Sequence, residues 1–325
     1  MDALVPFVLG IIIGSLVTYF IIRSQQEKEI AKLNKIRKYK LHARDGQGRD
    51  RIAKKRRYSA DAGLTGAPLT ESTEKNSGVD STELQQFLTS KGITIKSIPS
   101  KHDSDEVLGK LAYFMGERYA LIKPFYKRIK SNLDSGNSVR IHLKKYTQEE
   151  ISNICQLGNW LKQIAFLEEY KYQRSPRYIL DARPNRIPQA INFLCGQWLE
   201  IFVKEQVIRL IESCHLGLRY SYLLNPKIVL PDGNDFELDI LFKIEDEIFW
   251  FEAKTGDYQK HIEKYSRVSK ILELDSEHSY MILTDVNESS TKALSSMFNM
   301  TVANAEHLAK YLQPSLAKYS DSSPA

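Results

Sequence analysis

The chain has 325 residues, with 46 basic and 40 acidic side chains and a formal net charge of +6. Its composition, 42% hydrophobic and 26% charged, is typical of a globular protein. Residues 23–57 hold 14 of the basic and only 4 of the acidic residues, so the overall charge does not predict nucleic-acid binding. The three cysteines form no CxxC or Cys/His motif, which excludes a usual zinc site and fits a reducing compartment.

The first segment, residues 3–22 (ALVPFVLGIIIGSLVTYFII), contains no charged residue. At a rise of about 1.5 Å per residue, its length matches the roughly 30 Å hydrocarbon core of a bilayer. A cleaved signal peptide would begin with a positive region, whereas Asp2 precedes this segment and Arg23 follows it. We predict an uncleaved transmembrane helix over residues 1–22. Because positive charge lies only after it, the N-terminus is expected outside and the rest of the chain in the cytoplasm.

The basic residues 23–57 begin with apolar side chains at helical spacing. We interpret them as a juxtamembrane segment that is solvated or contacts anionic lipid head groups. Attraction to nucleic acid is a third and less specific interpretation. Residues 58–80 are poor in large apolar groups and rich in Gly, Ser, Thr and Asp, which predicts a flexible linker. At the other end of the chain, residues 316–325 are predicted to form a disordered tail.

Residues 81–185 predict a mostly helical module. Apolar spacing indicates helices and one strand, and a Thr147–Glu150 capping box precedes a helix over 151–167. An aromatic hairpin with a basic turn follows. This order resembles a winged helix, in which three basic residues would contact phosphates: Lys171, Arg174 and Arg177. The alternative, which we prefer, is a helical packing or dimerisation module that would make the chain a homodimer.

The most informative stretch is 236–256, FELDILFKIEDEIFWFEAKTG. Two β-rich runs flank a polar Glu-Asp dipeptide, which predicts a hairpin with a two-residue loop. In that register the cross-strand pairs include Asp239 with Glu252 and Glu237 with Lys254. Because side chains alternate between the faces of a strand, one face would be apolar and the other would gather these four polar residues at one end.

Carboxylates gathered in this way repel each other unless a cation lies between them. Their hard oxygen atoms favour Mg²⁺ or Mn²⁺, so we predict a divalent-metal site. The competing interpretation is a salt-bridge ladder on an exposed strand, because Glu-x-Lys alone is weak evidence. The spacing of Asp239 from Glu252-Ala-Lys254, after an aromatic run, is more specific. The literal dipeptide Pro231-Asp232 is a turn signal, and we reject it as a ligand.

This segment resembles the PD-(D/E)xK nuclease superfamily, whose restriction-endonuclease-like α/β core has the order αβββαβ. The order can be read here as a helix over 188–215, a strand over 220–230, the hairpin, a helix over 257–274 and a strand over 279–284. The WLE, ELDIL and EAKTG segments are similar to the nuclease domain of CRISPR ancillary effectors with a CARF sensor. The resemblance implies a nuclease-like domain over 186–315. Residues 1–80 offer no such sensor, so regulation by a cyclic oligonucleotide is not implied.

The resemblance also implies roles for individual residues. Asp239 and Glu252 would bind the metal together with the Ala253 carbonyl, and Lys254 would position a water and stabilise charge in the transition state. Glu200 on the first helix would act directly or through water. Its alternative is an exposed glutamate paired with Lys204. Early on the next helix, Gln259 and Lys260 would touch a phosphate. The stronger interpretation of these two residues is a solvated helix face.

These features predict a membrane-anchored, metal-dependent endonuclease or exonuclease. It would hydrolyse phosphodiester bonds of DNA or RNA at the cytoplasmic face of a membrane. Two other classes stay open. One is a catalytically silent nucleic-acid-binding or scaffolding domain, and the other is a membrane-tethered adaptor whose middle module binds protein.

Overall fold

The computed structural model describes residues 81–100, 105–213, 218–256, 258–259 and 262–319. All of these residues belong to one compact unit of the chain. The predicted transmembrane helix, basic segment and linker lie outside the described residues. Within the described ranges, no helix is both long and apolar enough to cross a bilayer. The fold class is α/β as predicted, with helices around three sheets.

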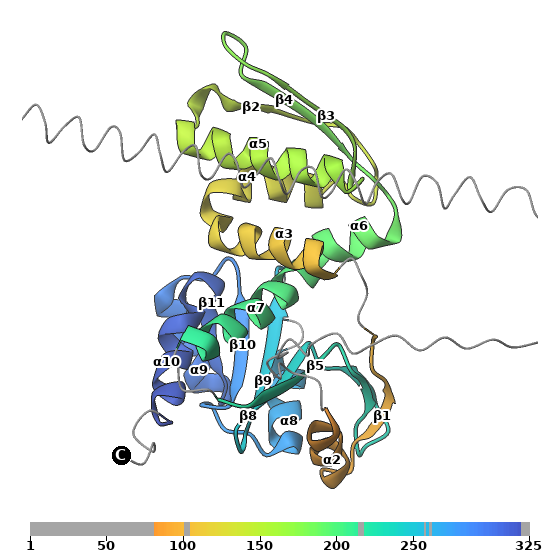
Figure 1. Cartoon of the computed structure of the whole chain (residues 1–325), viewed down its shortest axis with the longest axis vertical. Helices are drawn as coiled ribbons and strands as arrows, with labels where there is room; N and C mark the ends of the chain where they lie inside the picture. The colour runs from red at the N-terminus through yellow and green to blue at the C-terminus, as the bar shows by residue number, and fades with distance from the viewer. Residues whose placement is uncertain (1–80, 101–104, 214–217, 257, 260–261, 320–325) are drawn as a thin grey trace, which may run out of the picture. The chain divides into compact units, whose positions relative to one another are not determined.

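A five-stranded mixed sheet lies at the centre, with the strand order β11-β10-β9-β8-β5 (Figure 1). Strands β5, β8 and β9 are antiparallel neighbours, whereas β10 and β11 run parallel to β9. The bounds of these strands are Tyr220–Leu224 (β5), Ile240–Ile244 (β8), Glu247–Lys254 (β9), Ser279–Leu283 (β10) and Thr301–Asn304 (β11).

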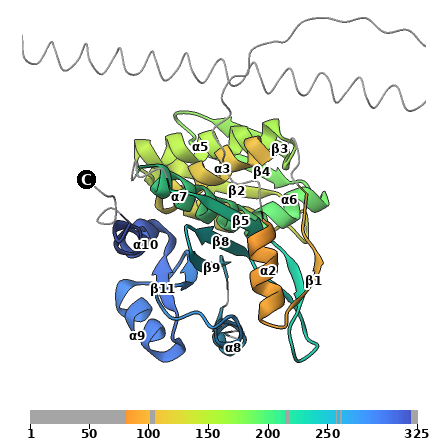
Figure 2. The ribbon, with the colours of Figure 1, turned by 60° about the horizontal axis from the view of Figure 1, so that its bottom comes forward.

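Both faces of this sheet are covered. One face packs on a core that includes residues of two helices, α7 (Trp198–Ser213) and α10 (Leu308–Ala317). The other packs on a second core with residues of α2 (Thr82–Ser90), α8 (Ile262–Leu272) and α9 (Glu288–Phe298) (Figure 2). Burial on both faces explains why the central strands are continuous apolar runs rather than alternating ones.

The β8–β9 hairpin has the predicted register, because Ile240 lies opposite Phe251 and Ile244 opposite Glu247. Asp239, directly before β8, therefore comes next to Glu252. The expected pairing of Glu237 with Lys254 is wrong. Glu237 is the last residue of a separate strand. That strand belongs to a second sheet, in which Glu237 pairs with Lys227.

This second sheet arises because the predicted strand over 220–230 is interrupted. Asn225 adopts a positive φ of 51°, and the following Pro226 has no N–H to continue the ladder. The chain therefore leaves the central sheet and forms a three-stranded antiparallel sheet in the order β1-β6-β7. Its strands are Thr94–Ser97 (β1), Lys227–Val229 (β6) and Asp235–Glu237 (β7).

The remaining elements form a third, antiparallel sheet and its helices. The sheet order is β2-β4-β3, with Val139–His142 (β2), Leu167–Gln173 (β3) and Ile179–Pro184 (β4). The helices are α3 (Asp105–Glu117), α4 (Tyr119–Lys130) and α5 (Gln148–Gln163). The Thr147–Glu150 capping box is confirmed. The helix after it ends at Gln163 rather than 167, because Ala165 has a left-handed φ of 62° and Leu167 begins β3.

Helices α3 and α7 approach each other closely at Gly116. A Cβ at this position would lie 2.1 Å from Cδ2 of Phe202, a buried side chain of α7. We expect Gly116→Ala to destabilise the fold by about 1–3 kcal/mol through overpacking. The matched control is Gly109→Ala in the same helix, where a Cβ would only touch Glu205 at 3.5 Å. Chemical denaturation of both variants checks this, and equal stabilities would contradict the close α3–α7 contact.

Candidate active site

The open end of the β8–β9 hairpin brings Asp239, Glu252 and Lys254 together. The Lys254 Nζ atom lies 2.9 Å from Asp239 Oδ2 and 2.6 Å from Glu252 Oε1. The backbone N–H of Ala253 donates a second hydrogen bond to Asp239 Oδ2, at 2.8 Å. Asp239 is only 5% exposed and Glu252 only 2%. A salt-bridge ladder on an exposed strand would leave these carboxylates in water, so their burial argues against that interpretation.

Glu200 reaches the same region from the first turn of α7. Its Oε2 accepts a hydrogen bond of 2.7 Å from the Asn225 side chain, whose Nδ2 also lies 3.4 Å from Glu237 Oε1. Lys204, the alternative partner that the sequence offered, pairs with Glu205 instead. Asn225 therefore links the helix carboxylate to the neighbouring sheet.

Burial dominates the electrostatics of the three carboxylates. Burial, with the Asp239 carboxylate second, raises the pKa of Glu200 to about 7 and that of Glu252 to about 8. Burial also raises the pKa of Asp239, although Lys254 opposes this. Burial alone would lower the pKa of Lys254, but Glu252 and Asp239 raise it above its ordinary value. Lys254 is thus firmly cationic between two carboxyl groups that are costly to ionise.

The donor chemistry of this cluster fits a hard divalent cation. Glu252 Oε2 is buried and has no hydrogen-bond partner among the described residues. No three His, Cys, Asp or Glu side chains in the described ranges are close enough to hold a metal ion by themselves. Mg²⁺, however, is usually held by one or two carboxylates, with water and substrate phosphate completing its shell. Asp239 and Glu252 are two carboxylates of the kind that such an ion uses.

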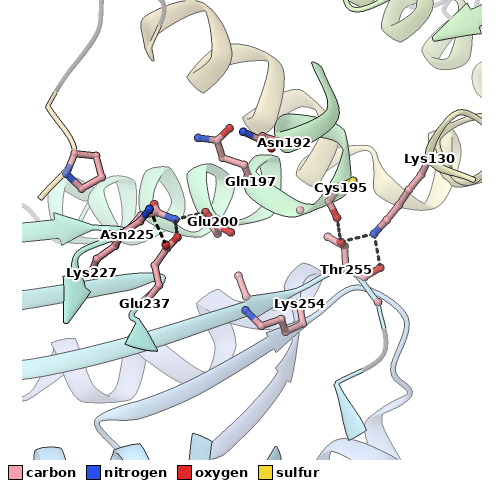
Figure 3. Close-up of a pocket in the computed structure, with 14 residues that line it drawn as sticks. Lys130, Asn192, Cys195, Gln197, Glu200, Asn225, Lys227, Glu237, Lys254 and Thr255 are labelled. Atoms are coloured by element: carbon pink, nitrogen blue, oxygen red, sulfur yellow. Dashed lines mark hydrogen bonds and ion pairs between the residues drawn. The ribbon is translucent and has the colours of Figure 1, made fainter. Parts of the chain in front are cut away.

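A cavity of about 600 Å³ opens beside Lys254 (Figure 3). Its wall includes the last residue of α4, the turn after β9 and a π-helical turn, η2 (Phe193–Gln197). This turn joins α6 (Pro188–Asn192) to α7. The charged and polar side chains that face the cavity include Lys130, Glu200, Asn225, Glu237, Lys254 and Thr255. Of the three carboxylates described above, Glu200 lines this cavity, whereas Asp239 and Glu252 lie behind Lys254 and do not belong to its wall.

The other predicted binding residues lie elsewhere. Three are exposed on the β3–β4 hairpin and do not line the cavity: Lys171, Arg174 and Arg177. Gln259 is exposed and is also absent from the cavity wall, whereas Lys260 lies outside the described residues. Sequence reasoning missed Lys130 and Asn225. The Asn225-Pro226 dipeptide, a strand breaker within the predicted strand, was the available signal for Asn225, and none pointed to Lys130.

No protein-family model and no curated protein matches the sequence. Among solved structures, the chain is similar to protein VC1899 from Vibrio cholerae, with 14% identity and a TM-score of 0.49 over 73% of this chain and 61% of that one. It is also similar to Can2 from Sulfobacillus thermosulfidooxidans, solved in complex with cyclic tetra-adenylate. The two chains share 13% identity and superpose with a TM-score of 0.50, over 72% of this chain and 60% of Can2. The chain spans about 60% of the length of these structures, and the likeness to Can2 shows a related fold alone.

Proposed function

We propose that this chain is a metal-dependent nuclease of the PD-(D/E)xK type. The observation that carries the proposal is one lysine ammonium held between two buried carboxylates, beside an open cavity. A purely structural sheet has no reason to bury this cluster, because desolvating carboxylates is costly unless their charge has a use. Hydrolysis of a phosphodiester is such a use, since negative charge accumulates on the phosphate as the reaction proceeds.

The order of elements supports the same assignment. Helix α7, strands β5, β8 and β9, helix α8 and strand β10 occur in the order αβββαβ, with β6 and β7 of the second sheet inserted between β5 and β8. This is the order expected for a restriction-endonuclease-like core. Before it, the order α4-β2-α5-β3-β4 is similar to a winged helix. In this proposal the exposed basic residues of its hairpin contact phosphates at a distance from the cavity: Lys171, Arg174 and Arg177.

Each residue of the cluster has its own role in the proposed hydrolysis. Asp239 and Glu252 would hold a Mg²⁺ or Mn²⁺ ion with the Ala253 carbonyl, and the Ala253 N–H fixes the orientation of Asp239. A bound ion would lower the pKa of a coordinated water and neutralise charge on the scissile phosphate. The Lys254 ammonium stabilises the additional negative charge of the transition state. Glu200 accepts a hydrogen bond from Asn225, and its role in this proposal would be to orient a water at the edge of the cluster.

The place of action follows from the N-terminal segment. Residues 3–22 anchor the chain in a membrane, with the N-terminus outside and the nuclease domain in the cytoplasm. The substrate, DNA or RNA, is therefore cut near the inner membrane surface. A silent nucleic-acid-binding or scaffolding domain is the alternative function, and the same experiment distinguishes it.

The proposal is tested by titrating Mn²⁺ and Mg²⁺ into the full-length chain, purified in a mild detergent, by calorimetry. We expect a binding isotherm for the wild type and none for the double variant Asp239→Asn, Glu252→Gln. The matched control is Asp235→Asn, an exposed carboxylate of β7 that pairs with Lys96. It should bind metal like the wild type. Salt-dependent nucleic-acid binding without any metal binding would instead identify a silent binding domain.

A further inference from the structure

Lys130 is a cation that helix α4 contributes to the cavity. It is half-buried, and its Nζ donates hydrogen bonds of 2.6 Å to Thr255 Oγ1 and 3.1 Å to the Thr255 carbonyl (Figure 3). Thr255 directly follows Lys254 in the chain. Lys130 therefore reaches the end of β9 from more than 120 residues away in sequence, and Lys130 and Lys254 line the same cavity.

The surroundings of Lys130 hold it in a defined position. Thr255 Oγ1 donates onward to the carbonyl of Cys195, at 2.7 Å, within the π-helical turn η2. The Tyr126 hydroxyl donates to the neighbouring Leu194 carbonyl at 3.1 Å and accepts from Trp198 Nε1 at 2.9 Å. A π-turn breaks the regular helical hydrogen-bond pattern and often marks a functional site. Here its carbonyls receive side-chain donors from two other elements.

The charge of Lys130 has no carboxylate partner among the described residues. The other two lysines of the cavity wall do have one, because Lys254 contacts Asp239 and Glu252 while Lys227 lies 3.9 Å from Glu237. Earlier on α4, Lys123 and Lys127 both pair with Asp285. Of these five lysines, Lys130 is the one whose ammonium hydrogen-bonds to neutral oxygen atoms instead of forming a direct ion pair, and the Asp285 carboxylate acts on it at longer range. Its positive charge is therefore available to an anion that enters the cavity.

The burial of the Lys130 ammonium is energetically unfavourable. Burial lowers the pKa of Lys130, which means that the folded protein pays to keep the ammonium charged. A neutral side chain of the same length could fill the space beside Tyr126, whose ring centroid lies 5.9 Å from the ammonium. A phosphate oxygen, in contrast, would form a charge-assisted hydrogen bond that compensates for the hydration lost on burial.

We propose that Lys130 is a substrate-binding residue that contacts a phosphate of the nucleic-acid strand next to the one that is cleaved. This inference rests on the proposed nuclease function and deepens it. It makes the site composite, with the metal-binding carboxylates on the hairpin and a phosphate contact on α4. The competing role is purely structural, in which Lys130 only braces the turn that carries Thr255.

The test compares Lys130→Met with the wild-type full-length chain in cleavage of a short labelled oligonucleotide, as DNA and as RNA, in Mg²⁺. We expect KM to rise about ten- to a hundredfold, because a charge-assisted hydrogen bond is lost. The slope of log affinity against log salt should become shallower by about one. The variant Lys130→Arg keeps the charge and should restore the slope. Lys127→Met is the same change on the same helix, outside the cavity wall. It should leave the KM and the salt slope unchanged.

The outcomes separate this inference from the function on which it rests. If the wild type neither binds nor cleaves the oligonucleotide, both the proposed nuclease function and this role of Lys130 are wrong. If the wild type cleaves, but Lys130→Met keeps the KM and the salt slope, the function stands and the phosphate contact is wrong. A fall in kcat with an unchanged KM would assign Lys130 to positioning Thr255, and it would likewise overturn the proposal.

Discussion

Replacing Lys254 with methionine is expected to slow metal-dependent cleavage by about 10²–10³-fold, the usual loss when one preorganised charge donor is removed from a transition state. Metal binding should survive this change. The Lys254 ammonium contacts both carboxylates directly, so its removal frees oxygen atoms that a cation needs. The signature is therefore a lower kcat with a metal affinity that is equal to or tighter than that of the wild type.

Single-turnover cleavage and metal titration on the same preparations would check this split. The matched control is Lys243→Met on the adjacent strand β8, where the lysine pairs with Glu83 away from the cavity. That variant should keep wild-type cleavage. Circular dichroism shows whether each variant is folded. A folded Lys254→Met variant that cleaves at the wild-type rate would remove Lys254 from the mechanism.

Without metal, the folded chain is expected to lose stability as the pH rises from about 4.5 to about 8. The pKa of Glu252 is about 8 in the fold, against 4.5 for an ordinary glutamate, and that of Glu200 is about 7. A carboxyl with a raised pKa binds its proton more tightly in the folded than in the unfolded state. Its stabilising contribution is complete below the unfolded pKa and disappears through the folded pKa.

The variant Glu252→Gln isolates this effect, because glutamine cannot ionise. One pKa unit corresponds to about 1.4 kcal/mol, so the variant should gain on the order of a few kcal/mol over the wild type between pH 5 and pH 8. Thermal or urea denaturation in EDTA at both pH values measures the difference. Glu263→Gln, the same change at an exposed site on α8, should follow the wild type. A Glu252→Gln variant whose stability changes with pH as the wild type does would refute the costly burial of Glu252.

The hairpin could be predicted from sequence because its determinants are local. Two apolar runs and a two-residue polar loop fix the register, and the register alone brings Asp239 next to Glu252. The same rule failed for Glu237. The break at Asn225-Pro226 redirects the chain into another sheet, so β7 is no longer an extension of β8. The error came from extending a local rule across a change of sheet.

The rest of the site could not be predicted because it depends on tertiary packing. Lys130 reaches Thr255 only after α4 packs against the η2 turn, through the Tyr126 and Trp198 side chains. No spacing in the sequence encodes a contact between positions so far apart. Glu200 was identified through a family resemblance, and its Asn225 partner depends on the interrupted strand. The hairpin sequence thus contains two carboxylates and the lysine between them, while tertiary packing forms the cavity beside Lys254.

The most direct measurement of the central claim is cleavage of labelled DNA and RNA by the full-length chain in Mg²⁺ and in EDTA, beside Asp239→Asn. Asp239 receives both the Ala253 N–H and the Lys254 ammonium, so an uncharged amide should disrupt the whole cluster. We expect products with the wild type in Mg²⁺, and none in EDTA or with the folded variant. Equal cleavage by the wild type and the folded Asp239→Asn variant, or cleavage that persists in EDTA, would contradict it.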